Sequence, residues 1–256
     1  MSKAVAIVTG ASSGIGRATA IRLARDFSGV VLAARRAAAL SEVAEEVRAQ
    51  GAEPLALEID LMAPAAAESV VDRALAKFGR IDALLNIAGA VPGIDLFEMT
   101  DEQWHAGAAL KLHGARRLTL RAWEALKAAK GSVVLMAGNA AEIPTAPAAA
   151  VGVINAAIVA LAKAFADRGL EDGVQVNSVS PGPVMTGRRL SMIEKWAAAH
   201  KVGVDQAKQT LLTKSGVGRY GEPQDIAELM AFLVSPAARW MTGAQLRIDG
   251  GEVKSI

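Results

Sequence analysis

The stretch that decides the fold is "VAIVTGASSGIGRATAIRLA", residues 5–24. An apolar run ends at Thr9, a glycine-rich turn follows, and a helical pattern begins behind the turn. Gly10, Gly14 and Gly16 tolerate positive φ angles and let backbone N–H groups come close to a ligand. The N-terminus of the helix that follows favours a pyrophosphate. This order of strand, turn and helix therefore predicts a dinucleotide site.

Short apolar runs alternate with longer helical patterns along the rest of the chain. Several of these runs are apolar on both sides, which is the pattern of strands buried on both faces of a sheet. Their alternation with helices indicates βαβ units and a parallel, doubly wound sheet, with residues 1–256 forming a single domain. The strands expected from the pattern are 4–9, 30–34, 53–58, 83–87, 132–136, 175–179 and 245–248.

The composition excludes several kinds of site. The chain has no Cys, so disulfides, thiolate metal sites and Cys nucleophiles are excluded. Its three His are scattered without carboxylates at ligand spacing, and no metal site is expected. The net charge of +2 and the lack of a Lys/Arg run argue against nucleic acid. There is no signal-peptide pattern, and the Ala-rich run 146–166 is interpreted as a buried helix, so a cytoplasmic protein without a membrane partner is expected.

The end of the second strand bears on the type of dinucleotide. Folds selective for NAD place an acidic residue here, which holds the ribose 2′-hydroxyl. This chain has Arg35 and Arg36 instead, and guanidinium groups suit a 2′-phosphate. The sequence therefore predicts NADP(H) in preference to NAD(H). The alternative is a pair of exposed arginines at a helix start.

Four motifs in order resemble the short-chain dehydrogenase/reductase family. They are "TGASSGIG" (9–16), "NIAG" (86–89), "SPGPVMTG" (180–187) and "RIDGG" (247–251), and the resemblance covers almost the whole chain. It implies a Rossmann-like sheet of about seven strands and an oxidoreductase that reduces carbonyls or oxidises alcohols. It also implies a homodimer or homotetramer that forms through the helices around 100–130 and 150–168.

The resemblance also assigns residues to the cofactor, and most of its motif positions are intact. Around the diphosphate and the neighbouring ribose it implies Ser13, Gly14, Ile15 and Gly16; Gly10 and Ser12 of the same turn, and Arg35 and Arg36 at the 2′-phosphate, are expected from the residues themselves. For the adenine and for the second ribose it implies Asp60 and Leu61, and Asn86, Ala88 and Gly89. For the nicotinamide it implies Pro181, Gly182, Val184 and Thr186. Ile87 replaces the commoner second Asn of its motif.

The catalytic positions of the family have all changed. The family uses an Asn that anchors a water, a Ser that positions the substrate oxygen, a Tyr acid/base and a Lys that grips the ribose. The matching positions here hold Lys111, Gly138, Val151 and Asn155. No shift of the alignment restores them, because the only Tyr is Tyr220 and no Lys occurs between residues 130 and 163.

Lys111 and Asn155 suggest an exchange of roles, since the family has Asn at the first position and Lys at the second. The interpretation is that Lys111, with a lowered pKa, reaches the ribose or a water and donates protons. The alternative is that Lys111 extends to solvent and both changes are drift. Glu142, on the loop after Gly138, is a further candidate acid/base, and its alternative is a solvated carboxylate.

Residues 187–216 correspond to the variable substrate loop of the family. Leu190, Ile193 and Trp196 form a helical apolar stripe that faces a core or covers a partly apolar, small-molecule substrate. Arg188 and Arg189 are candidates for a cofactor phosphate or an acidic substrate. The functions that remain open are an oxidoreductase with a rearranged site, an inactive NADP(H)-binding pseudoenzyme that acts as a sensor or oligomer partner, and a lyase or isomerase on the same fold.

Overall fold

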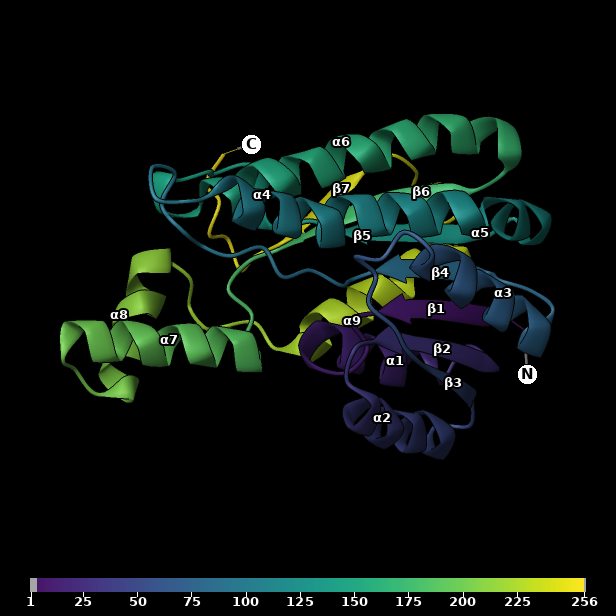
Figure 1. The fold of residues 1–256 in the computed structure, drawn as a ribbon, viewed down its shortest axis with the longest axis horizontal. Helices are drawn as coiled ribbons and strands as arrows, with labels where there is room; N and C mark the ends of the chain where they lie inside the picture. The colour runs from purple at the N-terminus through teal and green to yellow at the C-terminus, as the bar shows by residue number, and fades with distance from the viewer. Residues whose placement is uncertain (1–3, 256) are drawn as a thin grey trace.

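The computed structural model describes residues 4–255, and a seven-stranded parallel sheet forms its centre (Figure 1). The order across the sheet is β3-β2-β1-β4-β5-β6-β7. The chain adds β2 and β3 on one side of β1 and the later strands on the other side, as in doubly wound folds. The strands are β1 (Val5–Thr9), β2 (Gly29–Ala34), β3 (Glu53–Glu58), β4 (Ala83–Asn86), β5 (Ser132–Met136), β6 (Gln175–Pro181) and β7 (Gln245–Ile248). The predicted Rossmann-like α/β fold is confirmed, and each expected strand lies within two residues of its observed bounds.

Helices cover both faces of the sheet (Figure 1). One face carries α1 (Gly14–Leu23), α2 (Ala37–Ala49) and α9 (Pro223–Leu233). The other carries α3 (Ala66–Phe78), α5 (Ala115–Ala129) and α6 (Ala149–Asp172), with α4 (Asp101–Ala108) beside them. The pair α7 (Gly187–His200) and α8 (Val204–Ser215) projects from these layers, at the left in Figure 1.

The two covered faces explain the apolar strands. In β1, Ile7 packs into the core with Leu118 of α5, whereas the next residue, Val8, packs with Leu23 of α1. Successive side chains of a strand point to opposite faces, so both must be apolar when both faces are covered. All five residues of β1 are buried.

The Ala-rich stretch of the sequence is a layer helix of this fold. Residues Ala146–Asp172 are long and apolar enough to cross a membrane, and an 18-residue window within them has a mean hydropathy of 1.9. Ile158 and Phe165 of α6 are nevertheless buried in the core against the sheet. The interpretation of a buried helix therefore fits, and the helix brings Asn155, which is only 3% exposed, to the end of β5.

A π-helical segment, Ala109–Gly114, joins α4 to α5 and contains Lys111. The wider turn of a π-helix changes the direction of a side chain relative to a regular α-helix, and such turns occur often at functional sites. Gly114 allows the segment to pack closely, because a Cβ there would lie 3.1 Å from the Leu61 carbonyl oxygen.

The α7–α8 pair is held together by its own small core. Ile193 of the predicted stripe is fully buried and packs with Ala207 and Tyr220, while Leu190 is half-exposed. The Tyr220 hydroxyl donates to the Lys208 carbonyl oxygen at 2.9 Å. The stripe therefore serves mainly to join α7 to α8, and the only tyrosine of the chain is part of that packing.

Candidate functional site

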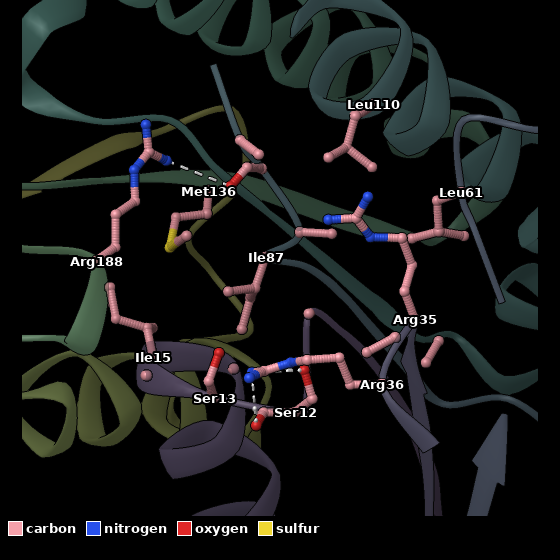
Figure 2. A pocket seen from close by; sticks show the side chains of 18 of the residues that line it. Ser12, Ser13, Ile15, Arg35, Arg36, Leu61, Ile87, Leu110, Met136 and Arg188 are labelled. Carbon is pink, nitrogen blue, oxygen red and sulfur yellow. Dashed lines mark hydrogen bonds between the residues drawn. The ribbon is translucent and has the colours of Figure 1, made fainter. Parts of the chain in front are cut away.

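A cavity of about 570 Å³ lies at the carboxyl ends of β1, β2 and β4 (Figure 2). Most of the residues expected at the cofactor line it: Gly10, Ser12, Ser13, Gly14, Ile15, Gly16, Arg35, Arg36, Asp60, Leu61, Ala88, Gly89 and Thr186. Other parts of its wall come from Ile87, Leu110, Met136 and Arg188. In open α/β sheets this edge, next to the reversal of strand order, is where ligands bind.

The glycine-rich turn has no room for side chains at two positions. Gly10 has a φ of +68°, and a Cβ there would lie 3.1 Å from Ala88 Cα. A Cβ at Gly16 would lie 2.2 Å from the Gly10 carbonyl oxygen, which is a severe overlap. The turn can therefore bring the start of α1 directly to the cavity. The first turn of this helix carries no acidic residue, so its positive end is available to an anion.

Thr9 holds the segment after β4 against this turn. Its hydroxyl oxygen accepts hydrogen bonds from the backbone N–H of Ile87 at 2.9 Å and of Ala88 at 3.0 Å. The side chain of Asn86 points elsewhere, because its Nδ2 donates to the Thr119 hydroxyl of α5 at 3.1 Å. Asn86, which was expected at the ribose, is thus 5% exposed and does not line the cavity.

The segment expected at the nicotinamide is divided between two places. Thr186 lines the cavity, and its methyl group would lie 3.2 Å from a Cβ at Gly14. Gly182 and Val184 line a different hollow, between the end of β7 and α9. Pro181 is the last residue of β6 and pairs with Ile248 of β7. Of the four residues expected here, only Thr186 therefore faces the main cavity in this structure.

The charge of the cavity wall is mainly positive. Three arginines and one acidic residue, Asp60, are among its lining residues. Arg36 donates to the backbone and hydroxyl oxygens of Ser12, both at 3.3 Å, and Figure 2 shows its side chain turned towards the glycine-rich turn. Arg35 extends along the cavity towards Leu61. Both arginines are exposed, so their guanidinium groups can reach a phosphate at the edge of the cavity.

Arg188 closes the opposite side of the cavity (Figure 2). Its guanidinium donates to the carbonyl oxygens of Val91 and, at 3.4 Å, of Gly89. Burial, with a smaller effect of the neighbouring Arg189 charge, lowers its pKa from the ordinary value. The side chain thus ties the start of α7 to the loop after β4. Because Arg188 also lines the cavity, its expected contact with a phosphate or an acidic substrate stays a prediction.

Lys111 lies behind the wall of the cavity. Its Nζ donates to the Ala137 carbonyl oxygen at 2.8 Å and to Asn155 Oδ1 at 2.5 Å. A Cβ at Gly89, a lining residue, would lie 3.0 Å from Lys111 Cδ. Burial, and secondarily the charge of Arg188, lowers the pKa of Lys111 to about 7. The alternative in which this side chain extends to solvent is therefore wrong.

Three of the four positions that the resemblance matches to the family's catalytic residues meet at one point. Lys111 contacts Asn155, and a Cβ at Gly138 would lie only 2.8 Å from Asn155 Nδ2. The Asn155 amide therefore fills the space next to a glycine that has no side chain. A Ser at position 138 would press on this amide, whose oxygen is held by Lys111. The three changes thus fit one another sterically.

The fourth position, Val151, belongs to an apolar cluster. It packs against Val91, Ala150 and Ile154, and Trp104 packs against the same three residues. A hydrocarbon side chain in these surroundings can neither donate nor accept a proton. The position that the resemblance matches to the family's acid/base therefore has apolar surroundings.

Glu142 is occupied by other side chains. Its Oε2 pairs with Arg247 at 2.7 Å, and its Oε1 accepts from Gln245 Nε2 at 3.0 Å. Both partners belong to β7, and Glu142 does not line the cavity. The structure thus ties this candidate acid/base to the edge strand.

A different carboxylate, Glu252, lies next to the altered positions and was missed from the sequence. It accepts a hydrogen bond from Asn139, which directly follows Gly138. Burial is the largest cause of the raised pKa of Glu252, and the Asn139 hydrogen bond opposes it. The two residues are 113 positions apart in the sequence. The only local signal was that Glu252 directly follows the "RIDGG" motif.

Comparisons with known proteins match almost the whole chain. A family model described as enoyl-(acyl carrier protein) reductase matches residues 10–252. The 3-oxoacyl-[acyl-carrier-protein] reductase of Synechocystis sp. is 32% identical over 252 residues, which cover 97% of this chain and 96% of that protein. The 7α-hydroxysteroid dehydrogenase of Escherichia coli K12 is 30% identical over 252 residues, 98% of this chain and 94% of the relative.

A solved structure extends this likeness to the whole fold. L-sorbose reductase from Gluconobacter frateurii, complexed with NADPH and L-sorbose, superimposes with a TM-score of 0.95. It is 27% identical in sequence, and the match covers 100% of this chain and 98% of that one.

Proposed function

Since the chain belongs to the short-chain dehydrogenase/reductase family of oxidoreductases, we propose that it is an NADP(H)-dependent carbonyl reductase or alcohol dehydrogenase with a rearranged active site. The observation that carries this proposal is the contact of Lys111 with Asn155 next to the cavity wall. It joins a cation with a pKa of about 7 to an amide at the point where the family's catalytic residues would lie.

The cavity suits a dinucleotide. Its glycine-rich turn packs against the backbone too closely at Gly10 and Gly16 to hold a Cβ, and the start of α1 faces the cavity. Ser13, Gly14 and Ile15 would hold the diphosphate there through backbone N–H groups and the helix end. Asp60 and Leu61 would hold the adenine. When bound, NADPH supplies the hydrogen and the electron pair that a carbonyl carbon gains.

Arg35 and Arg36 support NADP(H) over NAD(H). They follow β2, where an NAD-selective protein needs an acidic residue for the 2′-hydroxyl. Both line the cavity, and a 2′-phosphate would accept charge-assisted hydrogen bonds from them. The structurally similar L-sorbose reductase was solved in complex with NADPH.

Lys111 can transfer a proton without losing its position. A charged lysine has three N–H donors, and two of them are used by Ala137 and Asn155. Among residues 4–255, no acceptor contacts the third donor. After deprotonation the two hydrogen bonds can persist while a lone pair replaces the third N–H. With a pKa of about 7, both forms are present near neutral pH.

In the direction of reduction, Lys111 delivers this third proton to the carbonyl oxygen, directly or through one water. The carbonyl becomes an alcohol, and the neutral amine recovers a proton from solvent. In the direction of oxidation, the neutral amine accepts the proton of the alcohol. Positioned acids and bases of this kind contribute about 10²–10⁴ in rate, which replaces at least part of the missing tyrosine.

Val151 favours a second candidate, an NADP(H)-binding protein that does not turn over. Its apolar surroundings leave no protic group at the family's acid/base position. Such a protein would act as a sensor or as an oligomer partner.

We further propose a cytoplasmic homodimer or homotetramer. The helices expected to form its interface carry exposed apolar residues: Leu120 on α5 is 52% exposed and Val153 on α6 is 51% exposed. Burial of such residues against a second copy would be favourable. Light scattering at several protein concentrations would determine the number of copies.

Two measurements test the proposed function. Fluorescence titration of the purified protein with NADPH and with NADH compares the two affinities, and tighter binding of NADPH is expected. NADPH oxidation is then followed with L-sorbose, a 3-oxoacyl thioester, a 7-oxosteroid and simple ketones and aldehydes. Turnover of one compound supports the reductase. Binding without turnover of any supports the second candidate, and binding of neither nucleotide contradicts both.

A further inference from the structure

The Asn155 amide carries a hydrogen-bond donor without a partner inside the site. Asn155 is 3% exposed, yet its Nδ2 has no acceptor among residues 4–255. We propose that Asn155 Nδ2 is the donor that holds the carbonyl oxygen of the substrate, in place of the side chain that Gly138 lacks. This inference rests on the proposed function and names the residue that binds the reacting oxygen.

The chemistry of Lys111 determines which way the amide points. A lysine ammonium donates hydrogen bonds and cannot accept them, so the atom 2.5 Å from Nζ must be the amide oxygen. Nδ2 then lies on the other side of the amide. It faces Gly138, where a Cβ would be only 2.8 Å away. Because Nζ is also held by the Ala137 carbonyl oxygen, the orientation of the amide is fixed.

Asn155 Nδ2 is not fully covered by the protein, since among the described residues it is not one of the fully buried side-chain atoms that lack a partner. Gly138 has only hydrogen at Cα, so nothing of its own covers Nδ2. It follows β5, and Met136 at the end of β5 lines the cavity. Because solvent reaches this donor, a water or a ligand oxygen can serve as the acceptor that the protein does not supply. The free donor and the bare glycine therefore mark one small polar site beside the cavity.

A donor at this place suits carbonyl reduction. The carbonyl oxygen gains negative charge as the carbon is reduced, and a fixed donor stabilises that charge more than it stabilises the neutral ketone. Asn155 then acts as a catalytic residue that contacts the oxygen. Lys111 acts in two ways, since it orients the amide and supplies the proton.

The substitution Asn155→Asp tests this role with little change of shape. Aspartate keeps an oxygen for Lys111 but replaces the Nδ2 donor by a second acceptor, which repels the developing charge. We expect kcat to fall by about 10²–10³, as for loss of one oxyanion donor. The measurement uses the panel carbonyl that the unmodified protein reduces fastest. Unchanged NADPH affinity, measured by fluorescence, separates this loss from a loss of the cofactor.

The matched control is Asn177→Asp, a change of the same type at a buried amide on β6. Asn177 Nδ2 donates to the Met241 carbonyl oxygen, so this change lowers stability without reaching the cavity. We expect a lower Tm and an unchanged kcat for the control. Unchanged kcat in Asn155→Asp would overturn the inference and leave the proposed function standing. No turnover by the unmodified protein would overturn both.

A spectroscopic readout covers the case in which Asn155→Asp does not fold. The same carbonyl compound, labelled with ¹³C at the carbonyl, is bound with NADP⁺, so that no reaction occurs. A donor at its oxygen lowers the infrared C=O stretching frequency. We expect a lowered frequency in the unmodified protein and a smaller lowering in Asn155→Ala. The inference would be contradicted if the C=O frequency in the unmodified protein equals that of the unbound ketone. It would also be contradicted if both proteins lower the frequency equally.

Discussion

Lys111 Nζ and Asn155 Oδ1 lie 2.5 Å apart, although 44 positions separate the two residues in the sequence. The first belongs to the π-helical segment and the second to α6. A lysine at one position and an amide at the other keep a donor–acceptor pair between these two helical segments. Drift at a single position would leave an unpaired buried polar group, at a cost of about 1–3 kcal/mol.

The first prediction concerns the proton that Lys111 supplies. Lys111→Met should lower the rate of NADPH-dependent reduction by about 10²–10⁴. In the unmodified protein, reduction needs the ammonium, so its rate should fall as pH rises through about 7. Alcohol oxidation needs the neutral amine and should rise over the same range. Profiles of kcat against pH in both directions measure this, and an unchanged inflection in Lys111→Met would assign the proton to another group.

The second prediction concerns stability. The pKa of Lys111 is about 7 in the folded protein against an ordinary 10.5, so between these values the unfolded chain binds a proton that the folded chain does not. The free energy of unfolding should therefore rise with pH, by up to about 1.4 kcal/mol per pH unit from this group. The destabilisation from burying the charged amine is complete below about pH 7 and absent above about pH 10.5. Urea unfolding across this range should show a smaller slope for Lys111→Met, and equal slopes would contradict the burial of the charge.

Arg188 should tune the same pKa. Its positive charge is the second cause, after burial, of the lowered pKa of Lys111. Arg188→Gln removes the charge and keeps a donor for the Val91 carbonyl, so the inflection of the reduction profile should move to higher pH. Arg116→Gln, on the exposed side of α5, serves as the control and should leave the inflection in place. A shift to lower pH would show that the two cations do not interact as the structure indicates.

Gly16→Ala tests the glycine-rich turn. The added methyl group would overlap the Gly10 carbonyl oxygen at 2.2 Å, and the backbone must move to accommodate it. We expect a loss of about 1–3 kcal/mol or more in the free energy of unfolding, with weaker NADPH binding. Gly218→Ala is the matched control, because nothing lies within 4 Å of a Cβ there. Equal stability of the two variants in urea would show that the turn is more adaptable than its geometry indicates.

Arg36→Ser tests the choice of cofactor. Loss of a charge-assisted contact of about 1.5–3 kcal/mol should weaken NADPH binding by about 10–150-fold and leave NADH binding nearly unchanged. Fluorescence titrations at one ionic strength compare the two nucleotides. Arg48→Ser, which removes an exposed charge paired with Glu45 on α2, controls for a general loss of positive charge. If NADH binding weakens as much as NADPH binding, Arg36 contacts a part of the molecule that the two cofactors share, not the 2′-phosphate.

The sheet and the glycine-rich turn could be predicted from the sequence because their causes are local. A strand covered on both faces must be apolar at successive positions, and "VAIVT" is. A turn that brings the Gly10 carbonyl to Gly16 excludes any side chain at position 16, so the spacing of the glycines carries the geometry.

Directions of individual side chains could not be predicted in the same way. Asn86 belongs to a motif that suggested the ribose, but Thr119 on α5 supplies a partner for its amide. Glu142 is likewise occupied by Arg247 of β7. In each case a partner on another element decides which way a polar side chain turns, and no local pattern names that partner.

The sequence by itself predicted that Lys111, Gly138, Val151 and Asn155 stand where the family has Asn, Ser, Tyr and Lys. Only the tertiary structure decided that the two exchanged residues touch and that the amide fills the space beside Gly138. It also decided the pKa of Lys111. The physical reason is that contact and burial depend on how α6 and the π-helical segment pack over the end of β5, and residues far apart in the chain determine that packing together.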